Sequence, residues 1–257
     1  MKKIIKTFCN HIGSFLFWMN PLKLHEGFLS VKGAIYTGYI RKYFKVVGKD
    51  TTFQPSFRHL LGTQYITVGS NCHFREKTKL TAWDKYLSQT FKPEISIGND
   101  CNIGAYSHIT AINRITIGNN VSMGDFVLIT DNSHGSPDNI SEFNLNISKK
   151  TVYSRGPVIL EDNIWVGEHS CILPGVTVGR GSVIGAGSVI RQSVPPYAIV
   201  VGNPAKVVGF LYRPQDIHEQ EARIYPAEKR IPLEILEKNY QKYFYDRVKE
   251  INTFLRR

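Results

Sequence analysis

Residues 160–190 read LEDNIWVGEHSCILPGVTVGRGSVIGAGSVI, and a large apolar residue recurs at every sixth position of this stretch. The repeated residues are Leu160, Val166, Ile172, Val178, Ile184 and Ile190. Alternating strands have a period of two and helices a period of about 3.6, so a period of six is typical of neither. The spacing indicates a solenoid in which short strands alternate with regular corners.

The same period runs through earlier parts of the chain. Three further groups are Val68, Phe74 and Leu80; Ile97, Ile103 and Ile109; and Ile117, Met123 and Ile129. Glycine often follows the apolar residue, and a small or β-branched residue such as Cys101, Ser133 or Ser182 stands four places after it. We expect the glycines and asparagines to supply the positive φ angles of the corners. Three strands would close one triangular coil of about 18 residues, and several coils must stack to bury the apolar columns.

Four short motifs add a family resemblance that covers residues 65–208. They are DNSHG at 131–135, NIWVG at 163–167, GAGS at 185–188 and VGNPAK at 201–206. Together they resemble the hexapeptide-repeat acyltransferases, most of all the branch of maltose and galactoside O-acetyltransferases and the acetyltransferases of polysaccharide gene clusters. The resemblance implies a mainly β chain folded as a left-handed parallel β-helix. It also implies a homotrimer with active sites between subunits, and acetyl-CoA as the acyl donor.

The flanks do not keep the period of six, which divides the chain into three parts. We expect a helical N-terminal extension at 1–60, the β-helix at 61–210 and a helical C-terminal extension at 211–257. The apolar residues of the first twenty positions and those after Pro232 follow helical spacing. A second apolar segment, residues 31–47, is expected to form another helix that leads into the β-helix.

The repeat itself fails at residues 81–94 and 130–157, and long loops in a compact domain are usually functional or disordered. His134 lies in the second break, and by resemblance it occupies the position of the catalytic histidine. A hydroxyl is a poor nucleophile until its proton is removed, and histidine titrates near neutrality, so it can accept that proton. Asp131 is close enough in sequence to orient the imidazole, although Asp-Asn pairs also form ordinary turns.

Two residues are candidates for contact with the acceptor. Trp83 stands in the first break, and His108 lies near the place where sugar-acetylating relatives hold their acceptor. The alternative for His108 is an ordinary corner position, which is also the interpretation we favour for His169.

The donor residues are expected in the last coils. By resemblance, Gly167, Ala186 and nearby backbone would line the pantetheine arm of CoA, and Trp165 would form an apolar wall near the thioester. Phosphates favour Lys or Arg partners, and Arg191 and Lys206 stand where relatives place phosphate or adenine contacts. In so basic a chain, each of the two can also be a plain surface cation.

The amino-acid composition limits the classes of ligand and the cellular location that we expect for this protein. The formal charge is +11, which favours anionic ligands, but no nucleic-acid-binding motif is present. The four cysteines have no paired spacing, so neither a metal site nor a disulfide framework is expected. The basic, apolar start lacks a cleavage site and no run is long enough to cross a bilayer, so we expect a cytoplasmic protein. A second interpretation places residues 1–20 weakly on the inner face of an anionic membrane.

The sequence thus favours an acetyl-CoA-dependent O-acetyltransferase that modifies a hydroxyl of a saccharide. The main alternative is an N-acetyltransferase that acts on an amino group of a nucleotide sugar. A metal-dependent carbonic anhydrase with this fold requires three histidines on one metal, and His108, His134 and His169 lack the spacing. A solenoid without catalytic activity is the other alternative.

Overall fold

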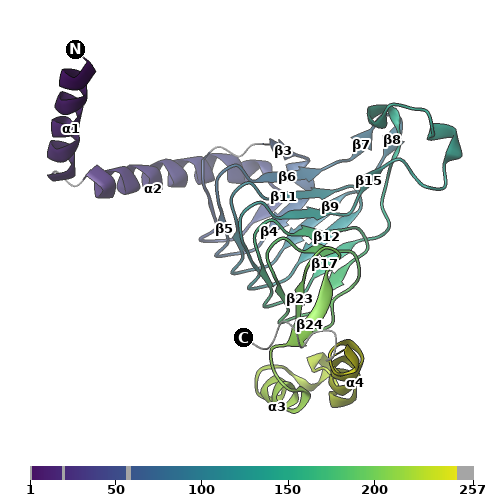
Figure 1. Ribbon diagram of the computed structural model, residues 1–257. Coiled ribbons are helices and arrows are strands. Elements are labelled where there is room, and N and C mark those ends of the chain that lie inside the picture. The colour runs from purple at the N-terminus through teal and green to yellow at the C-terminus, as the bar shows by residue number, and fades with distance from the viewer. Residues whose placement is uncertain (1, 19–20, 56–58, 248–257) are drawn as a thin grey trace.

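The computed structural model describes residues 2–18, 21–55 and 59–247. It is a parallel β-helix of triangular section with helices at both ends, and this confirms the fold class expected from the repeat. Figure 1 shows the coils stacked between helix α2 at one end and helices α3 and α4 at the other. Among the described residues, no helix has both the length and the apolarity needed to cross a membrane.

Three sheets form the faces of the prism, and every pairing between consecutive coils is parallel. The first face contains β1 (Val46–Val47), β4 (Ile66–Val68), β9 (Glu94–Ile97), β12 (Arg114–Ile117), β17 (Val158–Leu160) and β20 (Thr177–Val178). The second contains β2 (Thr52–Phe53), β5 (His73–Phe74), β10 (Asn102–Ile103), β13 (Ser122–Met123), β18 (Trp165–Val166), β21 (Val183–Ile184), β23 (Ala198–Val201) and β24 (Lys206–Phe210). The third contains β3 (His59–Leu61), β6 (Lys79–Ala82), β11 (His108–Ala111), β14 (Leu128–Thr130), β19 (Cys171–Ile172) and β22 (Val189–Ile190).

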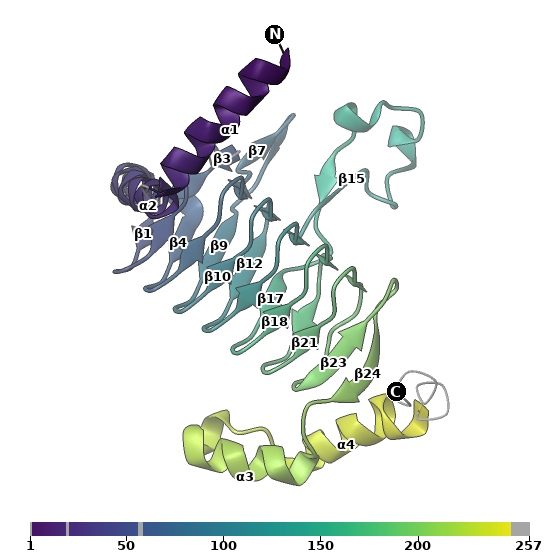
Figure 2. The same ribbon diagram turned by 60° about the vertical axis from the view of Figure 1, so that its left-hand side comes forward.

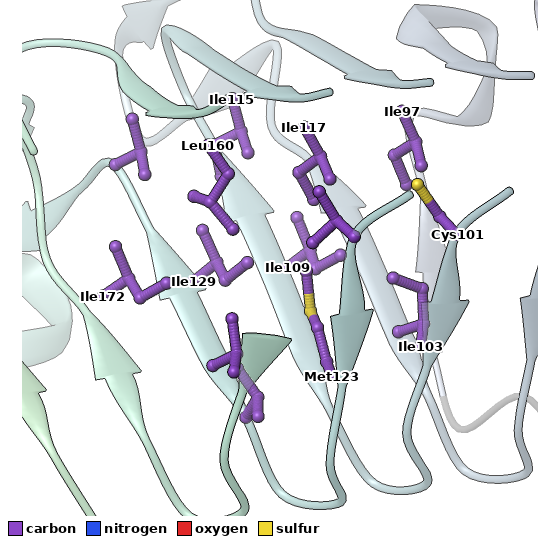
Figure 3. Close-up of a cluster of buried hydrophobic side chains, with 14 of the residues drawn as sticks. Ile97, Cys101, Ile103, Ile109, Ile115, Ile117, Met123, Ile129, Leu160 and Ile172 are labelled. Carbon is purple, nitrogen blue, oxygen red and sulfur yellow. The ribbon is translucent and has the colours of Figure 1, made fainter. Parts of the chain in front are cut away.

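The residues spaced by six form the core, as predicted. Ile97, Ile117 and Leu160 lie in register on one face, and Ile109, Ile129 and Ile172 lie in register on another. All six are at most 3% exposed. Figure 3 shows these side chains pointing into the prism in parallel columns. Each fully buried Ile or Leu contributes roughly 1.5–3 kcal/mol, so the stacked columns dominate the stability of the fold.

The positive φ angles expected from asparagine and glycine are present at several corners, including Gly175, Gly181 and Gly187, but other corner glycines serve a different purpose. Positive φ angles also fall on residues such as Asn71, Asp100 and Asn120, whereas Gly104 and Gly167 do not have positive φ. A Cβ on Gly104 would stand 2.0 Å from the carbonyl oxygen of Gly124 in the next coil. These glycines are therefore required by the close stacking of coils. Polar side chains also stabilise positive-φ corners, because hydrogen bonds link neighbouring coils there, as between Asn71 and Asp100.

The β-helix begins earlier than residue 61. Strands β1, β2 and β3 pair with β4, β5 and β6 and form a first coil within the range expected to be a helical extension. Helices α1 (Lys2–Trp18) and α2 (Pro21–Ile40) precede it, with a 3-10 turn η1 at Arg41–Tyr43. Phe44, Phe53 and Phe74 stack on one another at this end of the core.

At the other end, β24 pairs antiparallel with β23 and closes the prism. Helix α3 (Pro214–Ile224) follows, and α4 (Leu233–Tyr243) comes after a 3-10 turn η5 at Ala227–Lys229. Glu221 of α3 is 1% exposed and lies 3.0 Å from the Arg180 guanidinium, which anchors α3 on a corner of the prism. The expected C-terminal helix is confirmed as far as α4 and the 3-10 turn η6 (Tyr245–Arg247), while Val248, Ile251 and Leu255 lie outside the described residues.

Each break in the repeat folds into a two-stranded antiparallel unit. The first forms a hairpin of β7 (Lys85–Tyr86) and β8 (Gln89–Thr90). The second forms a ribbon of β15 (Ser133–His134) and β16 (Val152–Tyr153), whose loop carries the 3-10 turns η3 (Ile140–Glu142) and η4 (Ile147–Lys149). Figure 2 shows the ribbon and its loop projecting from the prism. Ser133, expected in a buried corner, is exposed because the chain leaves the coil at this point.

Candidate active site

The two breaks and one face of the prism enclose a cavity of about 430 Å³. It is lined by Trp83, Tyr86, His108, Thr110, Ile112, Asn132, His134, Ile147, Ser148 and Val152. Three of the residues selected from the sequence, Trp83, His108 and His134, therefore share one cavity although 51 residues separate the first from the last. No carboxylate is among the lining residues, so a basic or neutral group dominates the chemistry inside.

His134 stands on the ribbon at the mouth of this cavity. Its backbone pairs with Val152 across the ribbon. The ring is exposed and meets the edge of the Tyr86 ring, with 5.2 Å between the two centroids. Within the described part of the chain, the imidazole nitrogens have no hydrogen-bond partner, so both are free to meet a bound molecule.

Asp131 has partners other than the imidazole. Its carboxylate oxygens accept hydrogen bonds from the backbone amides of Ile112 and Asn113, each at 2.9 Å. The residue is completely buried, and this burial raises the pKa of the carboxyl group, while the amide hydrogen bonds counter the shift. Asp131 thus holds the corner between β11 and β12 beneath the cavity, and an orienting action on His134 stays a prediction.

His108 lies deeper in the cavity and is electrically neutral near pH 7. Burial, together with the neighbouring Lys79 and His59, lowers the pKa of the imidazole to about 4. The Nε2 atom lies 3.2 Å from the Thr81 hydroxyl. A neutral imidazole of this kind can donate or accept a hydrogen bond toward an uncharged polar ligand, but it does not provide a positive charge.

The residues expected to bind the donor lie elsewhere on the prism. Trp165 is 51% exposed on β18. Gly167 follows β18 at the corner between the second and third faces, and a Cβ there would stand 2.5 Å from the backbone nitrogen of Ala186 in the next coil. His134 follows β14 and so lies at the opposite edge of the third face. Within one chain, the donor corner and the His134 cavity therefore do not meet.

Arg191 and Lys206 come together at the C-terminal end of the prism. They line a second cavity of about 480 Å³ with Lys242 of α4. The other lining residues are uncharged. Three cations without an acidic partner in the lining make this cavity suited to phosphate groups.

Sequence reasoning did not select several of these residues. Tyr86 stands beside Trp83 in the first break, and its aromatic character in an irregular segment was a usable signal. Lys242 was hidden among many other lysines of the C-terminal part. Gln89 carried no signal, because its side-chain hydrogen bonds are to a single residue, Val152, which is 63 positions away.

Comparison with known proteins agrees with the repeat pattern. Residues 157–192 match the family described as "Bacterial transferase hexapeptide (six repeats)", and residues 94–124 match the "Hexapeptide repeat of succinyl-transferase". The repeats of this chain are therefore those of the hexapeptide transferases. The repeats thus indicate the class of hexapeptide-repeat transferases. Similar curated proteins and similar solved structures add detail.

Among curated proteins, a putative acetyltransferase of Staphylococcus aureus is 57% identical over 53 residues, which are 21% of this chain and 27% of that protein. WbbJ of Escherichia coli, a putative lipopolysaccharide biosynthesis O-acetyl transferase, is 35% identical over 117 residues, or 44% of this chain and 59% of that protein. The chain thus spans about a quarter of the first relatives it matches and under two thirds of WbbJ.

Among solved structures, the N-acyltransferase AntD of Bacillus cereus, in complex with dTDP and 3-hydroxybutyryl-CoA, aligns with a TM-score of 0.55. The alignment covers 73% of this chain and 93% of AntD at 20% identity, which establishes a shared fold.

Proposed function

We propose that this protein is an acetyl-CoA-dependent O-acetyltransferase that acetylates a hydroxyl group of a saccharide. The observation that carries the proposal is the cavity between the two breaks, where an unpaired imidazole faces a carboxylate-free space lined by polar and aromatic groups. Aromatic faces and neutral hydrogen-bonding groups suit an uncharged sugar. Similarity to WbbJ, a putative O-acetyl transferase, supports the same reaction.

In this mechanism His134 is the general base. It accepts the proton of the acceptor hydroxyl while the oxygen attacks the thioester carbonyl of acetyl-CoA. The new C–O bond forms, the C–S bond breaks, and the proton passes from His134 to the departing CoA thiolate. His108 and Trp83 contact the acceptor, and the neutral state of His108 suits a hydroxyl partner.

The residues present fit CoA in two places. Trp165, Gly167 and Ala186 lie at one corner, where Gly167 is buried against the Ala186 backbone and the Trp165 and Ala186 side chains are exposed, and we assign them to the pantetheine arm. Arg191 and Lys206, joined by Lys242, are assigned to the phosphate groups, because this cavity is cationic. No cluster of three His, Cys, Asp or Glu side chains in the described ranges is placed to hold a metal ion, and the mechanism uses none.

We further propose that the working unit is a homotrimer. The donor corner and the His134 cavity lie at opposite edges of the third face, so a complete site requires the edge of a second copy. We place the reaction in the cytoplasm, where free thiols such as those of Cys72 and Cys101 persist.

Residues 1–20 are the basis for proposing a membrane surface as an additional partner. Lys6 precedes an exposed apolar set on α1, in which Phe8, Phe15 and Phe17 are at least 60% exposed. We propose weak binding of this helix to an anionic membrane surface. Co-sedimentation with vesicles containing phosphatidylglycerol should decline as salt is added, and equal binding to neutral vesicles would contradict the proposal.

The reaction itself is tested with acetyl-CoA and a panel of saccharides, with thiol release as the signal. Mass spectrometry should find one added acetyl group per product, and mild base should remove it because esters hydrolyse readily. An acetyl group that persists in mild base would instead indicate an amide, and hence an N-acetyltransferase that acts on an amino sugar. Absence of thiol release across saccharides and amino sugars alike would contradict both reactions.

A further inference from the structure

The hairpin formed by the first break grips the ribbon formed by the second. The Gln89 side chain donates a hydrogen bond from Nε2 to the Val152 carbonyl oxygen at 3.0 Å, and its Oε1 accepts one from the Val152 amide at 2.8 Å. Val152 is the residue that pairs with His134 across the ribbon. One side chain therefore satisfies both backbone groups on the outer edge of the strand that faces His134.

Tyr86 makes a second connection from the same hairpin. Its hydroxyl donates to the Ser148 carbonyl oxygen at 2.8 Å, and its ring meets the His134 ring edge-on. The base of the hairpin is itself fixed, since the Tyr65 hydroxyl donates to the Asp84 carboxylate at 3.0 Å. The contacts thus run from the prism through the hairpin to the ring of His134.

The ribbon needs such support. Each of its strands has only two residues, and an isolated two-stranded ribbon is at best marginally stable in water. The Asp131 carboxylate accepts hydrogen bonds from the backbone amides of Ile112 and Asn113, and its observed partners do not include the imidazole. The observed contacts that hold His134 are those of the ribbon and of the hairpin beside it.

We propose that Gln89 and Tyr86 are positioning residues that place the His134 imidazole for proton transfer. The proposal rests on the assignment of His134 as the base. The first break would then have two functions: Trp83 would contact the acceptor, and the hairpin would position His134. A shift of about 1 Å in a catalytic group can reduce a rate by about 100-fold. Loss of the hydrogen bonds that hold Val152, the cross-strand partner of His134, should therefore have a measurable effect on turnover.

The test is the variant Gln89→Ala, which removes both hydrogen bonds to Val152 and leaves Tyr86 in place. We expect kcat to fall by about 10-fold or more. The KM for acetyl-CoA should stay unchanged, because the donor corner lies at another edge of the prism. Ser88→Ala is the matched control, since Ser88 is exposed in the turn of the same hairpin; it should retain wild-type turnover.

A double variant separates positioning from a general loss of structure. If Gln89 acts through His134, adding Gln89→Ala to His134→Ala should cause no further loss of turnover. A full additional loss would overturn the proposal while leaving the base assignment intact. Wild-type turnover of His134→Ala alone would overturn the base assignment, and the positioning role with it.

Hydrogen exchange provides a readout that does not depend on activity. In Gln89→Ala the Val152 amide should exchange faster, because it loses its acceptor, whereas the amides of the central strands β12 and β13 should be unchanged. Unchanged protection of the Val152 amide from exchange would contradict the proposed role of the hydrogen bonds between Gln89 and Val152. Faster exchange throughout the prism would show a global loss of stability and would also contradict it.

Discussion

At the scale of single residues, the proposed chemistry depends on His134. Its side chain lies outside the apolar columns, on an exposed ribbon, so its removal leaves the core untouched. His134→Ala should keep the melting temperature of the wild type and lose about 100-fold or more in kcat, the contribution of a positioned base. His169→Ala is the control, because that ring stacks on Phe126 at a corner, with centroids 4.8 Å apart, and lines no part of the cavity. Activity loss in the control alone would move the base to His169.

His108 makes a second residue-scale prediction, on pH and stability. Its pKa falls from 6.5 to about 4 on folding, because burial disfavours the charged ring. The unfolded chain therefore binds the proton first, and stability present above pH 6.5 is lost as the pH falls toward 4. His108→Gln should reduce this loss, as measured by the free energy of unfolding in urea at pH 7 and pH 5. An identical pH dependence in the variant would show that His108 does not titrate abnormally.

The cavity also shows which parts of a site can be predicted from a sequence. His134, His108 and Trp83, which line the cavity, could be selected from the sequence because each lies in or beside a segment whose pattern is distinctive. Asp131 was interpreted either as a residue that orients His134 or as part of an Asp-Asn turn. Its carboxylate accepts hydrogen bonds from Ile112 and Asn113 of the preceding coil and from the side chain of Asn132. Gln89 could not be selected from the sequence, since a single polar residue in an irregular loop does not reveal a partner 63 positions away.

At the scale of elements, the coils were predictable and their boundaries were not. A period of six identifies each apolar column, because every coil repeats the same geometry. The first coil escaped detection since Val47 and Phe53 are six apart but Leu60 is seven further on, which interrupts the period. Helix α3 lies within the expected helical C-terminal extension, but its bounds were not predicted, because only Pro214, Ile217 and Glu221 of its eleven residues are buried and the apolar stripe is short.

Coil stacking makes glycine indispensable at some positions and replaceable at others. A Cβ on Gly104 would collide with the Gly124 backbone, whereas one on Gly33 of α2 would meet no atom within 4 Å. Gly104→Ala should therefore destabilise the protein by at least about 1–3 kcal/mol, the usual cost of overpacking. Gly33→Ala should stabilise it by about 0.5–1 kcal/mol, because alanine favours the helix. Urea unfolding measures both, and equal effects would contradict the stacking argument.

Helix α4 contributes to the site assigned to the donor through Lys242. Arg191 and Lys206 of the prism and Lys242 of α4 line one cavity, which we assign to CoA phosphates. Lys242→Ala should raise the KM for acetyl-CoA and leave kcat nearly unchanged, as expected for loss of uniform binding. With acetyl-dephospho-CoA as the donor, wild type and variant should differ less if Lys242 contacts the 3′-phosphate. Lys238→Ala, on the same helix and outside the cavity lining, should match the wild type with both donors.

At the scale of the whole molecule, the proposed donor and acceptor residues lie too far apart within one copy to form a single site, and this is the reason for proposing an assembly. His134 and the Gly167–Ala186 corner occupy opposite edges of one face of the prism, and the triangular core between them is filled with side chains. A cyclic assembly places different edges of neighbouring copies against each other. The trimer proposed above would therefore build each site from the His134 edge of one copy and the donor corner of the next.

Mixed assemblies test this arrangement directly. His134→Ala lacks the base, and Ala186→Trp fills the donor corner with a bulky side chain at an exposed position, so each variant alone should be inactive. When the two are produced together at equal levels, random mixing in a cyclic trimer should give about a quarter of the sites an intact base and an intact donor corner. Activity should recover to about that fraction of the wild type. Sites built within a single chain would show no recovery, and a monomer by light scattering would exclude the shared site as well.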